Sequence, residues 1–359
     1  MSDRTPNSDP TRVTVLGVGQ MGLVCANGLA GPDRGADAGR PPVDVRVWGH
    51  DPDEVGALAQ TRESERLPGF RLIDSVRVCL DAEEALAETD VVVAAIPAQF
   101  LRGAFESIRD KLPRNAGVVS VAKGIEVGSL LRPSQAIAEA LDDDPDSAAR
   151  PLGVLSGPTI AAELARCMPA TMIAASDPAT DDGTFARELQ DLFTTSWLRI
   201  YTNDDLIGVE LAGATKNVIA IAAGILDGLN AGYNAKSALL ARGLAEIARL
   251  GGAMGASHDT FFGVAGAGDL ATTCFSPEGR NRSCGEALGK GGTLEGYIAG
   301  SPMVVEGVAT TRAVVALAAK YRVEMPIAQA VHDVLFDGLD PLQAITGLMS
   351  RAPKAERVG

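Results

Sequence analysis

Lys216 is the residue whose type and surroundings most directly indicate chemistry. It is the only charged residue in residues 211–226, a stretch of small and branched apolar residues without proline that predicts a buried helix. Burying an ammonium costs several kcal/mol unless it is paired or partly neutral. Burial also lowers a lysine pKa, by up to about 3–5 units, which would let Lys216 exchange a proton near neutral pH. Alternatively, the side chain could lie along the helix and leave its ammonium in water.

Other polar residues in apolar or glycine-rich segments are candidates for the same site: Lys123, Thr159, Asn217, Asp269, Arg280, Asn281 and Glu306. Asp269 follows a glycine-rich turn, so it could cap the next helix, pair with Lys216 or accept a hydrogen bond from a substrate hydroxyl. Arg280-Asn281-Arg282 precedes a predicted helix, and guanidinium groups beside helix N–H groups suit a phosphate. A solvated basic turn has the same composition. Glu306 could be a surface acid or a cofactor contact.

A glycine-rich turn near the start of the chain predicts a dinucleotide site. The strand at residues 12–16 runs into Gly17-Val18-Gly19-Gln20-Met21-Gly22, and a helix is expected from Gln20 to about Ala30. The first glycine permits the tight turn, the second lets the backbone approach a pyrophosphate, and the third allows close helix–strand packing. N–H groups at the helix start then favour the phosphates.

The tip of the second strand bears on the choice of cofactor. This strand, residues 43–48, ends in Gly49-His50-Asp51. An acid at the tip usually holds the ribose 2′-hydroxyl of NAD, but here glycine and histidine come first, so NAD and NADP both stay possible. His50 could pack on the adenine or lie on the surface. Residues 31–42, rich in glycine and proline, predict a flexible insertion before this strand.

Alternating apolar runs and helical periodicities predict the fold. Strands are expected at residues 90–96, 118–122, 152–155, 171–175 and 197–201, with helices at 100–111, 133–141, 160–166 and 183–193. This alternation is typical of an α/β protein with a Rossmann-type, doubly wound parallel sheet. Ligands of such sheets bind at the carboxyl ends of the strands, where Pro97, Lys123 and the Ser156-Gly157-Pro158-Thr159 turn are expected.

Residues beyond about 203 show helical periodicity alone, at 204–226, 236–251, 282–288, 308–320 and 328–336. We therefore predict a disordered leader at residues 1–10 and a dinucleotide-binding Rossmann domain at 11–203. An all-helical C-terminal domain for substrate and catalysis is expected at 204–350, followed by a flexible tail at 351–359.

Composition narrows the classes of partner. A net charge of −14 over 359 residues argues against nucleic acid or an anionic membrane as a main partner, so any anion site must be local. Five widely spaced cysteines without a CxxC pair fit reduced thiols. The three histidines do not cluster with cysteines or carboxylates, so no metal is expected. Without an apolar signal core or an uncharged apolar run of about 18 residues, we expect a cytoplasmic protein with no membrane span.

The order of several segments resembles the NAD(P)-dependent glycerol-3-phosphate dehydrogenases. These segments are GxGxxG, WGHDP, AKGIE, SGPT, GATKNVIAIAAG, the GAGDL turn, CFSPEGRNR, VVEG and EMPI, and they extend over about residues 12–350. The adjacent Lys216-Asn217 and the RNR turn are the most specific of them. The resemblance implies reversible hydride transfer between NAD or NADP and a small substrate, dihydroxyacetone phosphate or glycerol 3-phosphate, in a homodimer.

The resemblance also implies roles for individual residues. Lys216 corresponds to the family's proton acceptor, and Lys123 and Asp269 are expected to complete the catalytic set. The expected substrate contacts are Lys123, Gly157, Thr159, Lys216, Asp269, Gly279, Arg280 and Asn281. The expected cofactor contacts are Gly17, Gly19, Gln20, Met21, Gly22, His50, Phe100, Lys123, Ala161, Arg280, Val304 and Glu306.

The sequence departs from the family at Gln20-Met21, where serine or alanine followed by an aromatic residue is usual. This change should alter packing near the nicotinamide or the diphosphate. Three alternatives stay open: a related dehydrogenase for a hydroxyacid or 6-phosphogluconate, a non-catalytic nucleotide sensor, and an enzyme for another small phosphorylated ketone. The first class places its lysine and asparagine several residues apart, and Lys216 and Asp269 argue against the second.

Overall fold

Eight strands form one sheet in the order β3-β2-β1-β4-β5-β6-β7-β8. The computed structural model describes residues 9–32, 42–142, 150–177, 181–300, 304–352 and 355. Most of the predicted leader, insertion and tail lie outside these residues. The strands are β1 (Thr11–Leu16), β2 (Val43–Trp48), β3 (Arg77–Val78), β4 (Val91–Ala94), β5 (Gly117–Ser120), β6 (Leu152–Ser156), β7 (Ala170–Ser176) and β8 (Leu198–Asn203).

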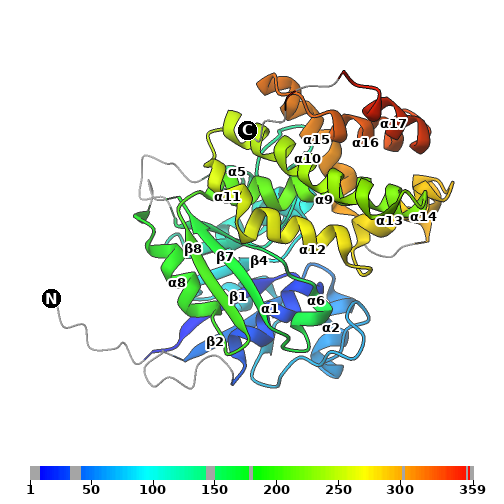
Figure 1. Cartoon of the computed structure of the whole chain (residues 1–359). Helices are drawn as coiled ribbons and strands as arrows, with labels where there is room; N and C mark the ends of the chain where they lie inside the picture. Colours follow the sequence, from blue (N-terminus) through cyan, green and yellow to red (C-terminus); the bar gives the residue numbers. More distant parts are fainter. Residues whose placement is uncertain are drawn as a thin grey trace.

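Helices cover both faces of this sheet, which confirms the doubly wound α/β fold (Figure 1). Along β4, Val91 and Val93 pack with side chains of α1, α2 and α8, whereas Val92 and Ala94 pack with α4 and α5. Successive side chains of a strand point to opposite faces, so both rows must be apolar. The helices are α1 (Gln20–Ala30), α2 (Pro52–Thr61), α3 (Ala82–Leu86), η1 (Ala98–Phe100), α4 (Leu101–Ile108), η2 (Arg109–Lys111), α5 (Pro133–Leu141), α6 (Ala161–Leu164) and α8 (Thr184–Phe193).

The sheet is parallel as predicted except at one pair, because β7 runs antiparallel to β6. A parallel crossover must carry the chain back along the length of the strand, usually by a helix. The connection from β6 to β7 holds only α6, a helix of four residues. At about 1.5 Å per residue such a helix is too short to return the chain, so the chain reverses directly.

A second group of helices follows β8 and is organised around α9 (Leu206–Gly228). The others are α10 (Gly232–Ala253), α11 (His258–Phe262), η3 (Val264–Gly268), α12 (Asp269–Phe275), α13 (Arg280–Gly289), α14 (Leu294–Ala299), α15 (Glu306–Tyr321), α16 (Pro326–Phe336) and α17 (Pro341–Met349). The sequence patterns missed α2, α3, α11, α14 and α17, which are mostly short or polar. The proposed domain boundary falls between β8 and α9.

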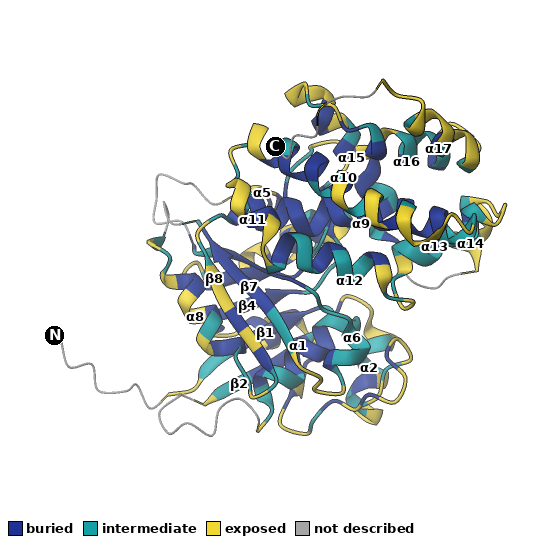
Figure 2. Ribbon diagram, in the orientation of Figure 1, coloured by how far each residue is buried: buried dark blue, intermediate teal, exposed yellow. Residues whose placement is uncertain are grey.

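Helix α9 is buried on all sides by its neighbours (Figure 2). Every residue from Gly208 to Leu226 is buried, which explains why the helix shows no polar face. Among the described residues, α9 alone is long and apolar enough to cross a membrane, but 89% of its apolar window is covered by the rest of the protein. Its apolarity is therefore that of a core helix.

Glycines let α13 pack directly on the backbone of α9. A Cβ atom at Gly224 would lie 1.9 Å from the carbonyl oxygen of Arg282, and one at Gly285 would lie 2.0 Å from that of Ile221. Similar short distances recur one turn further on, between Gly228 and Gly289. No other residue type permits this approach, which fixes the first turn of α13 beside α9.

Gly224→Ala should therefore lower the free energy of unfolding by about 1–3 kcal/mol or more, because α13 must move away from α9. Urea unfolding measures this change. The control is Gly56→Ala in α2, where nothing lies within 4 Å of the added Cβ. That variant should be neutral or more stable by up to about 1 kcal/mol. Equal effects of the two substitutions would contradict the role of the α9–α13 contact.

Candidate active site

A cleft of about 320 Å³ brings together residues from the carboxyl edge of the sheet and from the helices that follow it. Its lining draws on α1, the segment after β5, the turn after β6, α9, α12 and the start of α13. Thirteen of the predicted site residues line it: Gln20, Met21, Lys123, Thr159, Ala161, Lys216, Asn217, Asp269, Gly279, Arg280, Asn281, Val304 and Glu306.

The centre of the cleft is a carboxylate shared by two lysines. Lys216 Nζ lies 2.5 Å from Asp269 Oδ1, and Lys123 Nζ lies 2.8 Å from Asp269 Oδ2. The Lys216 side chain is 7% exposed and that of Asp269 is 1% exposed. Lys123 also donates to the Gly157 carbonyl at 2.8 Å and to Thr159 Oγ1 at 3.1 Å. Asp269 begins α12, and Gly268 rather than Asp269 occupies the cap position.

Burial gives Lys216 the proton affinity that acid–base chemistry needs. Burial is the largest cause and lowers the pKa of Lys216 to about 8. Attraction to Asp269 opposes this shift, and repulsion from Lys123 adds to it. A group with a pKa near the working pH can both donate and accept a proton.

Thr273 is a site residue that the sequence analysis missed. Its hydroxyl lies 2.6 Å from Lys216 Nζ, and it lines the cleft. It follows Asp269 by four residues, so the two side chains share one face of α12. That spacing was visible in the sequence once Asp269 was a candidate.

Polar contacts hold α9 against the sheet and so position Lys216. Asn217 Nδ2 donates to the main-chain carbonyl of Lys123 at 2.9 Å. Between α9 and the start of α5, Glu210 accepts hydrogen bonds from Ser134 N at 2.7 Å and Ser134 Oγ at 2.8 Å, and it pairs with Arg132. Both contacts link α9 to segments of the sheet region, so the two lysines reach Asp269 from fixed backbones.

The basic turn at the start of α13 offers groups for an anion. Arg280 is exposed, and its Nη1 donates to the Val304 carbonyl at 3.1 Å. The side-chain oxygen of Asn281 accepts a hydrogen bond from Gly307 N at 2.9 Å. Its side-chain nitrogen is therefore the atom that can donate to an anion. Gly279 occupies the cap position of α13 without a side-chain cap. N–H groups of the first helical turn are therefore available to a phosphate.

The glycine turn fits a dinucleotide. Gly17 has φ +109°, and a Cβ there would lie 2.5 Å from the Ala95 carbonyl oxygen. A Cβ at Gly22 would lie 2.0 Å from the Gly17 carbonyl oxygen, so both glycines are required by packing. Gly19 has nothing within 4 Å of its Cβ position, which leaves the approach that a pyrophosphate needs.

Several predicted cofactor contacts lie outside the cleft lining. His50 is exposed, and Phe100 is 57% exposed.

Glu306 does line the cleft, and its Oε1 accepts a hydrogen bond from Ala98 N at 3.3 Å. Burial raises the pKa of Glu306. Gly157 has φ +140° and contributes its carbonyl to Lys123.

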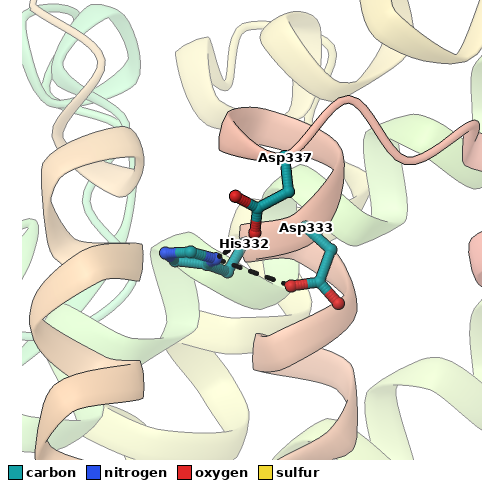
Figure 3. A group of neighbouring side chains, drawn as sticks. All are labelled: His332, Asp333 and Asp337. Carbon is teal, nitrogen blue, oxygen red and sulfur yellow. Dashed lines mark ion pairs between the residues drawn. The ribbon is translucent and has the colours of Figure 1, made fainter.

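The expectation that no histidine clusters with carboxylates is wrong for His332 (Figure 3). Its Nδ1 lies 3.5 Å from Asp333 Oδ1 and 3.3 Å from Asp337 Oδ2. His332 and Asp333 lie in the last turns of α16, Asp337 is the residue that follows this helix, and none of the three lines the cleft. Because the carboxylates are 32% and 61% exposed, this group has the character of a surface ion pair, and we assign no metal to it.

Fold and site together define a Rossmann-type dehydrogenase that uses a nicotinamide dinucleotide. Two family profiles match the chain: NAD-dependent glycerol-3-phosphate dehydrogenase N-terminus over residues 12–181, and its C-terminus over residues 205–346. The chain belongs to the family of NAD(P)-dependent glycerol-3-phosphate dehydrogenases.

Individual relatives agree with this assignment. The chain is 43% identical to a Chlorobium limicola protein named glycerol-3-phosphate dehydrogenase (NAD(P)+), covering 96% of this chain and 99% of that one. It is 44% identical to a Thermobifida fusca protein of the same name, covering 97% and 99%. The crystal structure of the Coxiella burnetii glycerol-3-phosphate dehydrogenase superposes with a TM-score of 0.86 at 31% identity, covering 95% and 99%.

Replacing Lys216 should reveal the cost of its burial. The pKa of Lys216 falls from 10.5 to about 8 on folding. The free-energy cost of burying its charged form is therefore fully present below pH 8 and disappears as the pH rises through 10.5. Relative to wild type, Lys216→Met should gain at least about 1 kcal/mol more stability at pH 7 than at pH 10. Denaturant unfolding at both pH values measures this difference. A difference that does not change with pH would contradict a depressed pKa.

Proposed function

We propose that this chain catalyses reversible hydride transfer between NAD(P)H and dihydroxyacetone phosphate, giving sn-glycerol 3-phosphate. The observation that carries this proposal is the buried Lys216, paired with Asp269 in a cleft that also contains the start of the dinucleotide helix and the basic turn of α13. Together they supply a proton donor, a cofactor cradle and a phosphate site within one cavity.

Lys216 acts as the general acid in reduction and as the general base in oxidation. When bound, the nicotinamide supplies or accepts the hydride. As negative charge develops on the carbonyl oxygen, the Lys216 ammonium stabilises it and donates a proton. In the oxidising direction the neutral amine removes the hydroxyl proton. Asp269 holds both amines in place, and Lys123 adds positive charge beside the reacting oxygen.

The turn that begins α13 holds the phosphate of the substrate. The donors of this turn are the Arg280 guanidinium, the Asn281 amide nitrogen and the N–H groups of the first turn of α13. Fixing the phosphate fixes the distance of the carbonyl carbon from the hydride, which is a large part of the rate gain in such reactions. The net charge of the chain is −14, so this local cluster must outweigh the overall repulsion of an anion.

A substrate panel tests the function. Purified protein is assayed with dihydroxyacetone phosphate, other phosphorylated ketones and 2-keto acids, with NADH and with NADPH, by the loss of reduced-nicotinamide absorbance. Dihydroxyacetone phosphate should give the highest kcat/KM. A higher value with an unphosphorylated keto acid would contradict the proposal.

We also propose that the enzyme is a cytoplasmic homodimer, as the resemblance to its family implies. Light scattering of the purified protein should give twice the mass of the chain. When cells that express the protein are fractionated, it should be found in the cytoplasmic fraction and not in the membrane fraction. A monomer, or a membrane-bound protein, would contradict these two proposals.

Lys216→Ala should lower kcat by at least about two decades, because a positioned acid–base group contributes roughly 10²–10⁴-fold. Binding of NADH, measured by fluorescence titration, should be unchanged. The matched control is Lys236→Ala, which removes another buried lysine that pairs with Asp227 outside the cleft. Turnover near that of wild type in the Lys216 variant would exclude Lys216 as the acid–base group.

Arg280→Ala should raise the KM for dihydroxyacetone phosphate by about tenfold or more, because a charged hydrogen bond contributes about 1.5–3 kcal/mol. The loss of kcat should be smaller. Arg312→Ala is the control, because its guanidinium packs 4.0 Å above the Phe336 ring, away from the cleft. An unchanged KM for the Arg280 variant would remove this residue from the phosphate site.

A further inference from the structure

Arg66 contacts two elements that face a dinucleotide in a Rossmann fold: the start of α1, which faces the pyrophosphate, and the start of α2, which follows the strand tip beside the ribose. Gln20, the first residue of α1 and part of the cleft lining, donates from Nε2 to the Arg66 carbonyl at 2.6 Å. The Arg66 side chain reaches the first turn of α2, the helix that follows the tip of β2. In this fold the ribose 2′ position lies beside that tip.

The Arg66 guanidinium is already engaged there. Its Nε and Nη2 bind the two carboxylate oxygens of Glu54, the second at 3.0 Å. Such a two-pronged pair is the geometry that arginine also uses for phosphate. Asp51 adds electrostatic attraction, and its own carboxylate accepts from Asp53 N and Glu54 N at the start of α2.

The surroundings of this pair carry an excess of negative charge. The segment from residue 50 to residue 66 has five carboxylates and two arginines. Its other arginine, Arg62, donates from Nη1 to the Val76 carbonyl at 2.6 Å. A 2′-phosphate would therefore have to take Arg66 from Glu54 and leave that carboxylate unpaired beside a dianion. A 2′-hydroxyl would carry no such penalty.

We propose that the Glu54–Arg66 pair is a selectivity element that disfavours NADP relative to NAD. By holding Arg66 at the first turn of α2, Glu54 withholds it from a 2′-phosphate. The inference rests on the dinucleotide site of the proposed function. It concerns only the ribose end of that site and leaves the catalytic residues unchanged.

Equilibrium binding tests this element without using activity. NADH and NADPH are each titrated into the full-length protein, and the two Kd values are compared. Wild type should bind NADPH no more tightly than NADH. Glu54→Gln removes the negative charge and frees Arg66, so the Kd for NADPH should fall about tenfold while that for NADH stays within about twofold.

A second substitution assigns the gain to Arg66. In the double variant Glu54→Gln with Arg66→Gln, the tighter binding of NADPH should be lost. The matched control is Glu126→Gln, which breaks the two-pronged pair of Glu126 with Arg102 outside the cleft lining and should change neither Kd. Arg102 keeps its contact with Glu139 at 3.0 Å in this variant.

Either of two results would overturn the proposal: equal shifts for both cofactors in Glu54→Gln, or a gain that survives in the double variant. In both cases NADH would still bind, so the proposed function would stand. If wild type bound neither nucleotide, the dinucleotide site would fail, and the selectivity element would fail with it.

Discussion

The sharing of one carboxylate by two ammonium groups is the interaction on which the rest of this structure depends. An isolated lysine inside α9 would be expelled or would stay neutral, and an isolated aspartate at the start of α12 would be equally costly. Placed together, Lys216, Asp269 and Lys123 leave a net positive charge in a partly closed cleft. This net positive charge would attract an alkoxide or a phosphate ester electrostatically.

Keeping this arrangement requires that segments far apart in the sequence stay at fixed distances. Asp269 is presented by η3 and α12, which follow the long pair α9 and α10. The backbone contact of Gly224 and Gly285 fixes the start of α13 beside α9. Glu210, buried among donors from the start of α5, fixes α9 against the sheet. The packing of α9 thus fixes the backbone that carries Lys216, so that its buried ammonium stays paired with Asp269.

The strongly acidic character of the chain is compatible with two anionic ligands because the positive groups are concentrated. Lys123, Lys216 and Arg280 line one cavity, while most other charges lie on the surface. Buried charges interact through a medium of lower polarity, so they dominate the local potential at short range. At the ribose end we propose a different, more exposed element, in which pairing with Glu54 withholds Arg66 from a 2′-phosphate.

Local patterns in the sequence were sufficient for the parts of the protein whose structure is determined locally. The spacing Gly17, Gly19, Gly22 predicted the turn and the start of α1 at Gln20, because this pattern of glycines is typical of a strand that turns tightly into a helix. The apolar run around Lys216 predicted a buried helix, since burial on all sides removes any polar periodicity. Asp269 was recognised as a candidate with three possible roles.

Only the tertiary structure decided among those roles and made the pairings. Asp269 lies 53 residues from Lys216 and 146 from Lys123, so no local pattern could assign them to one another. The side-chain oxygen of Asn281 accepts a hydrogen bond from Gly307 N, and Glu54 pairs with Arg66. Strand β7 runs antiparallel to β6. Each of these facts depends on how distant segments pack, because packing geometry, and not the periodicity of a single segment, determines which polar groups come within hydrogen-bond distance.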